Sequence, residues 1–166
     1  MRKIVLISTL PPINTSLSEY GAFLVQGIIN ISKDTEIHVL ADFSEDMTDI
    51  KEMDNDRLNV TRIWKFNSWS NPIKIIKKLL EIKPDVVIFN LQFASFGNSK
   101  IPALLGLTTP LIARRLGFKV ITVLHNIVDA MALEEPYFAK NKLDRFLIQA
   151  GGHVATRILL QSTRLV

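Results

Sequence analysis

The chain of 166 residues contains no cysteine and only three histidines. Without cysteine it forms neither a disulfide nor a thiolate nucleophile, and zinc sites with cysteine ligands are excluded. His38, His125 and His153 stand far apart and lack the spacing of metal ligands. We therefore expect no metal and no other cofactor.

Long apolar runs and an excess of one charge are also missing. The longest apolar stretch, residues 101–113, is interrupted by Pro102, Gly106 and Pro110 and is shorter than the roughly 20 residues that span a bilayer. The apolar run near the N-terminus, residues 4–7, is too short for a signal peptide. A net charge of +4 is small for a nucleic-acid-binding domain, so no nucleic-acid partner is expected. We expect a cytoplasmic protein, with the inner face of the membrane as the alternative location.

What is present is the pattern of an α/β protein. Apolar residues make up 48% of the chain and charged residues 22%, as in an ordinary globular domain. Apolar runs rich in β-branched residues predict strands, and amphipathic segments between them predict helices. The strands are expected at residues 3–8, 36–41, 58–66, 85–89 and 119–124, the helices at 16–31, 73–82, 102–116 and 134–161, and a further strand from 164.

This alternation predicts one domain over residues 1–166, with a doubly wound, mostly parallel Rossmann-like sheet and helices on both faces. In such sheets ligands bind outside the carboxyl ends of the strands. The loops at residues 9–15, 90–99 and 125–129 should meet there. Ser16 and Glu19 match a capping box, which predicts Ser16 as the N-cap of the first helix.

The first of these loops lacks the residues of common nucleotide sites. It contains no glycine, whereas dinucleotide binding uses Gly-x-Gly-x-x-Gly in this turn. No Walker loop and no Gly-x-Ser-x-Gly elbow occur either. NAD or FAD binding in the usual mode and serine-hydrolase chemistry are therefore disfavoured.

Three other features have both a structural and a functional interpretation. His125 ends the fifth strand beside Asn126 and shortly before Asp129, and it is either a hydrogen-bonded structural histidine or a functional one. The lysines of the second helix form either a solvated face or a contact with anionic lipid. Trp64, Phe66 and Trp69 either cover the core or line a groove for an acceptor.

Several segments, taken in order, resemble the N-terminal half of glycosyltransferase family 4, the retaining transferases of GT-B architecture. The matching pieces are Ile7-Ser8-Thr9-Leu10-Pro11-Pro12, Leu17-Ser18-Glu19-Tyr20-Gly21, Lys83-Pro84-Asp85-Val86-Val87, Phe96-Gly97, Pro102-Ala103, Gly106-Leu107 and Thr122-Val123-Leu124-His125-Asn126. The histidine in Leu-His-Asn is the sharpest of them.

The resemblance implies an acceptor-side domain that faces a second, donor-binding domain across a cleft. The partners would be a nucleotide-sugar donor, a sugar or lipid-linked acceptor, and that second domain in cis or in trans. The chain lacks the family's Glu-x7-Glu pair and ends on Leu165-Val166 without a closing element. We therefore expect an incomplete hexosyltransferase-like enzyme, inactive without the donor-binding domain, with a further contact to the membrane surface.

The resemblance also assigns residues. His125 would be catalytic and lie near the transferred sugar. Pro12, Asn14, Thr15 and Ser16 would border the donor phosphates, and Glu19 and Tyr20 match the family's loop and helix pattern. Asn126 and Asp129 are added because they follow the same strand end. The competing hypothesis is a stand-alone α/β binding or regulatory module for a small anionic ligand or a partner protein.

Overall fold

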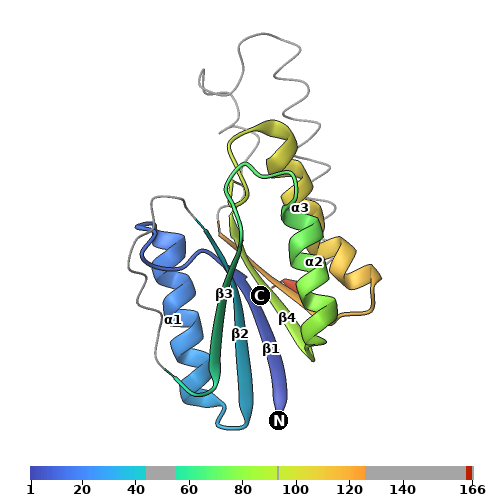
Figure 1. Ribbon diagram of the computed structural model, residues 1–166. Coiled ribbons are helices and arrows are strands. Elements are labelled where there is room, and N and C mark those ends of the chain that lie inside the picture. Colours follow the sequence, from blue (N-terminus) through green and yellow to red (C-terminus); the bar gives the residue numbers. More distant parts are fainter. Residues whose placement is uncertain (44–54, 93, 126–163, 166) are drawn as a thin grey trace.

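A computed structural model of the chain describes residues 1–43, 55–92, 94–125 and 164–165 (Figure 1). Strands and helices alternate along it. They are β1 (Arg2–Ser8), α1 (Ser16–Ile31), β2 (Thr35–Asp42), β3 (Leu58–Trp64), α2 (Asn71–Ile82), β4 (Val86–Gln92), α3 (Lys100–Arg115), β5 (Val120–His125) and β6 (Arg164–Leu165). The helices expected between residues 134 and 161 lie outside the described residues.

The strands form one sheet in the order β3-β2-β1-β4-β5-β6, and every neighbouring pair is parallel. This is the strand order of the Rossmann fold, in which the chain returns to the centre after its third strand. The central strand β1 pairs with β2 on one side and β4 on the other. The predicted doubly wound parallel sheet is confirmed.

Helices cover both faces of this sheet, with α1 on one face and α2 and α3 on the other (Figure 1). Successive residues of β1 therefore point into different cores: Leu6 packs under α1, while Val5 and Ile7 pack under α2 and α3. Burial on both faces explains why the strand is an uninterrupted apolar run. No helix in the described ranges is long and apolar enough to cross a bilayer.

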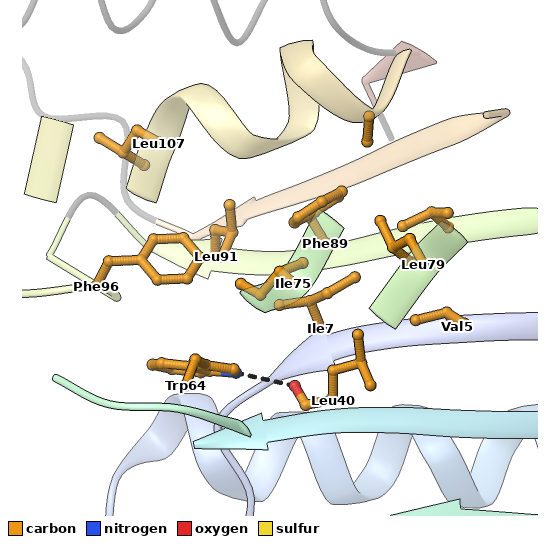
Figure 2. Packing of buried hydrophobic residues seen from close by; sticks show 12 residues of the cluster. Val5, Ile7, Leu40, Trp64, Ile75, Leu79, Phe89, Leu91, Phe96 and Leu107 are labelled. Atoms are coloured by element: carbon orange, nitrogen blue, oxygen red, sulfur yellow. Dashed lines mark hydrogen bonds between the residues drawn. The ribbon is translucent and has the colours of Figure 1, made fainter. Parts of the chain in front are cut away.

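The core beneath α2 and α3 is closed at one end by Trp64 (Figure 2). Its indole Nε1 donates to the Leu40 carbonyl at 2.9 Å, and its ring lies 5.2 Å from the ring of Phe96. Phe96 fits against Gly106 of α3, where an added Cβ would come within 2.2 Å of the Phe96 ring. Trp64 therefore covers the core, whereas Phe66 and Trp69 are exposed.

Two local predictions need correction. The N-cap of α1 is Thr15, whose Oγ1 accepts from the Ser18 amide at 3.2 Å, so Ser16 is the first helical residue and the predicted capping box is wrong. Thr15 has the extended backbone that an N-cap requires. The strand β4 also continues to Gln92, so residues 90–92 belong to a strand and not to the predicted loop.

Candidate functional site at the carboxyl edge of the sheet

The carboxyl ends of β1, β4 and β5 lie next to one another in the sheet. The strand order reverses between β1 and β4, and open α/β sheets bind ligands at this switch point. Ser8 is the last residue of β1, Asn90 lies near the end of β4, and His125 is the last residue of β5. Three polar side chains thus stand on three adjacent strands at the expected edge.

These three side chains form a hydrogen-bonded chain, called the edge chain below. His125 Nε2 lies 2.7 Å from Asn90 Oδ1, and Asn90 Nδ2 donates to Ser8 Oγ at 2.9 Å. The Ser8 hydroxyl in turn donates to the Thr9 carbonyl at 2.7 Å. Both Ser8 and Asn90 are fully buried. The edge chain therefore links the ends of three strands through groups that are shielded from water.

The direction of the bonds fixes the protonated nitrogen of His125. Because the Ser8 hydroxyl gives its hydrogen to a carbonyl, it can only accept from Asn90. The Asn90 amide group therefore turns its nitrogen to Ser8 and its oxygen to His125. An amide oxygen only accepts, so Nε2 of His125 must carry the hydrogen. In the neutral ring this leaves Nδ1 as the nitrogen with a free lone pair.

Tyr20 of α1 packs against the same imidazole. The two rings meet edge to face, with centroids 4.4 Å apart and an interplanar angle of 72°. Burial lowers the pKa of His125 below its ordinary value of 6.5, so the ring is neutral at neutral pH. The edge thus offers an oriented, uncharged imidazole that can accept a hydrogen bond through Nδ1.

Close packing of α1 on β1 depends on Gly21. A Cβ at this position would lie 2.4 Å from Ser8 Oγ and 2.7 Å from the Thr9 carbonyl oxygen. Any larger residue would therefore push α1 away from the edge chain. This is the role of the third glycine in dinucleotide-binding turns, which allows helix and strand to approach. Gly21 has this role although the preceding loop contains no glycine.

Side chains of β2 and β3 hydrogen-bond to the backbone of the loop between β1 and α1. Asp42 Oδ1 accepts from the Leu10 amide at 3.3 Å, and the Arg62 guanidinium donates to the carbonyls of Pro11 and Asp42. The Arg62 Nη1 atom is 3.9 Å from the Asp42 carboxylate and bonds the backbone oxygen instead. Burial therefore outweighs this cation and raises the pKa of Asp42 to about 6.

Of the predicted site residues, the structure brings His125 and Tyr20 together. Pro12, Asn14, Thr15, Ser16 and Glu19 lie exposed in the loop and first turn before Tyr20, and their ligand-binding role stays a prediction. Asn126 and Asp129 lie outside the described residues.

The side chains linked to His125 were not predicted from the sequence. Asn90 and Ser8 are polar residues inside or at the end of apolar strands, and this interruption is the signal that could have marked them. Gly21 had a similar signal, because a glycine inside an amphipathic helix usually has a packing reason.

Comparisons with known proteins define the class of the domain. No protein-family model and no curated protein sequence matches the chain. Among solved structures it is similar to dTDP-glucose 4,6-dehydratase of Bacillus anthracis in complex with NAD, with 11% identity over 98% of this chain and 50% of that one and a TM-score of 0.51. It is also similar to the enzyme WbmH of Bordetella bronchiseptica in complex with NAD+, with 12% identity over 99% of this chain and 54% of that one and a TM-score of 0.56.

A third structure, apo UGT2 of Phytolacca americana, has 10% identity over 80% of this chain and 31% of that one, with a TM-score of 0.48. The chain spans about half the length of the first two proteins. At such identities the first two likenesses show the fold alone. The protein is a Rossmann-like α/β domain with a hydrogen-bonded histidine at the carboxyl edge of its sheet.

Proposed function

We propose that the protein is the acceptor-side domain of a retaining glycosyltransferase and that His125 is its functional side chain at the sugar. The single observation that carries this proposal is the edge chain. Buried Ser8 and Asn90 hold the imidazole in one tautomer at the end of β5. Full burial of two polar side chains is costly unless both are hydrogen-bonded. The histidine so held lies at the switch point of the sheet, where open α/β sheets bind ligands.

In the proposed reaction, an acceptor hydroxyl attacks the anomeric carbon of a nucleotide sugar from the face on which the diphosphate leaves. The new oxygen–carbon bond forms, the bond to the diphosphate breaks, and the acceptor proton passes to the leaving phosphate. The neutral Nδ1 of His125 accepts a hydrogen bond from a hydroxyl of the transferred sugar and so orients the sugar ring. The donor nucleotide is held by a second domain, supplied in cis or in trans.

The test uses the protein purified from its source cells together with every chain that accompanies it. Release of nucleoside diphosphate from a panel of nucleotide sugars is measured with extracted acceptors. Replacing His125 with alanine should slow transfer about 10- to 100-fold, the value of one buried hydrogen bond at about 1.4 kcal/mol per tenfold. His125→Gln, which keeps an accepting oxygen, should recover part of the rate.

A wild-type preparation that releases no nucleoside diphosphate from any donor would refute the proposal. The competing function, a binding module for a small anion, would then gain support if inorganic phosphate shifted the His125 ring signals in NMR spectra. Equal rates for the wild-type protein and His125→Ala at saturating substrates would remove His125 from the mechanism.

A further inference from the structure

The helical layer on one face of the sheet concentrates the positive charge of the chain. Residues 65–83 and 94–119, which contain α2, α3 and their flanking loops, carry nine lysines and arginines and one glutamate, a net charge of +8. The whole chain carries +4, so all other residues together carry −4. Cations and anions are therefore separated along the chain, and the α2 and α3 layer forms the positive face.

Large apolar side chains project from this layer into solvent. Trp69 is 62% exposed, Ile73 72% and Leu80 50%. Ile73, Lys77 and Leu80 follow one another at helical spacing on α2, whose opposite side buries Ile75 and Leu79 in the core. The helix thus presents apolar residues on both sides, and only one side has a partner among the described residues.

Trp69 stands on a loop that is fixed at both ends. The Asn71 side chain accepts from the Lys65 amide at 3.1 Å and donates to the Lys65 carbonyl at 2.8 Å, closing the loop on itself. Asn67 Oδ1 accepts from the amides of Asn98 and Ser99, at 3.0 and 3.1 Å, and so joins the loop to the start of α3. The loop backbone that carries the exposed indole is therefore fixed before any partner arrives, which lowers the entropic cost of ordering the loop on binding.

We propose that the outer face of α2, made of Trp69, Ile73, Lys74, Lys77 and Leu80, docks on the surface of an anionic lipid bilayer. Apolar side chains among lysines suit the boundary between headgroups and acyl chains, where an indole also prefers to lie. Nucleic acid would leave Ile73 and Leu80 without a partner, and it usually requires denser cations with stacking aromatics. This inference is independent of sugar transfer.

The two tryptophans of the chain allow a direct test. Trp64 is 1% exposed and serves as an internal reference, whereas Trp69 reports contact with lipid. The full protein is mixed with vesicles of neutral phosphatidylcholine, or of the same lipid with phosphatidylglycerol, at low and high salt. We expect binding to the anionic vesicles, weaker at high salt, with quenching of Trp69 by brominated acyl chains and with Trp64 unaffected.

The variant Lys74→Glu with Lys77→Glu should weaken this binding at least about 25-fold, because each lysine near an anionic surface contributes about fivefold. Lys78 is left in place because it pairs with Glu81 at 3.1 Å. The matched control is Arg2→Glu with Lys33→Glu, which lowers the net charge equally at exposed positions outside this face. The control should bind like the wild type at the same ionic strength.

Three results would overturn the proposal. They are equal binding to neutral and anionic vesicles, equal loss of binding in both double variants, and vesicle binding without quenching of Trp69. Binding of heparin that responds to the α2 variant, without any binding to vesicles, would likewise assign the face to a soluble polyanion. The variant Trp69→Phe separates the fluorescence of the two tryptophans, because the remaining fluorescence comes from Trp64 and should not respond to brominated lipid.

Discussion

Replacing Asn90 with aspartate tests the edge chain, because the variant keeps the side-chain shape while changing the charge beside His125. In the wild-type protein His125 donates to a neutral oxygen 2.7 Å from Nε2, and burial keeps the ring's pKa below 6.5. In the variant the imidazolium would face a carboxylate at the same distance. An opposite charge in direct contact favours the charged form by about 1 to 3 pH units.

We therefore expect the pKa of His125 to rise above its ordinary value in Asn90→Asp. Each pH unit corresponds to about 1.4 kcal/mol of interaction between the two charged groups. A histidine whose pKa is raised in the folded state stabilises the protein at low pH and loses this contribution as the pH rises through the folded pKa. The wild-type histidine, whose pKa is lowered, has the opposite dependence.

The assay is a pH titration of the imidazole nitrogens by long-range proton–nitrogen NMR, with the His125 signals assigned from the His125→Gln variant. The wild type should show hydrogen on Nε2 at neutral pH. Asn90→Ala should give a mixture of both tautomers and a loss of about 1 to 3 kcal/mol in unfolding free energy, because buried polar groups lose a partner.

A wild-type spectrum with the hydrogen on Nδ1 would refute the assignment of the edge chain. An unchanged pKa in Asn90→Asp, with the fold intact, would show that Asn90 does not position the ring.

Two further predictions concern stability. Gly21→Ala should lower the free energy of unfolding in urea by about 1 to 3 kcal/mol or more, because its Cβ would meet Ser8 and Thr9. The control Gly27→Ala, which has open space around it, should raise the free energy of unfolding by about 0.5 to 1 kcal/mol through its higher helix propensity. Equal effects of the two substitutions would contradict the packing role of Gly21. The pKa of Asp42, about 6 against an ordinary 3.8, means that the folded state holds a proton that the unfolded state releases between these values. Stability should therefore increase as the pH falls from about 6 to 4, by up to about 3 kcal/mol, and Asp42→Asn should abolish this increase in chemical unfolding measured at each pH.

Much of the fold could be predicted because strands buried on two faces are continuous apolar runs. The predicted first strand, 3–8, differs from β1 by one residue. The fourth was predicted to end at Phe89 because Asn90 and Gln92 are polar, yet β4 contains both. The Asn90 side chain is accommodated because it bonds Ser8 and His125, and the backbone N–H of Gln92 donates to Ser95 Oγ at the end of the strand. The apolar sequence pattern therefore ends at Phe89, whereas pairing with β5 continues the strand to Gln92.

The position of the candidate site could be predicted from the sequence, but the side chains that contact His125 could not. A histidine at the end of a predicted strand indicates the sheet edge, so His125 could be found from its sequence position. Its partners are 35 residues earlier in β4 and in α1 near the start of the chain. The N-cap shows the same limit on a smaller scale, since Thr15 and Ser16 carry equivalent hydroxyls and the loop conformation decided between them.

The position of β1 has a consequence for how the chain is synthesised. β1 emerges before the other described strands of its sheet, but one of its two neighbours, β4, follows about 80 residues later in the sequence. Until β4 has been made, β1 has an open edge whose backbone amides and carbonyls can pair with another chain. Nascent chains shorter than this should aggregate unless a chaperone covers that edge. Completion of β4 is therefore the point during translation at which the growing chain can first close its centre.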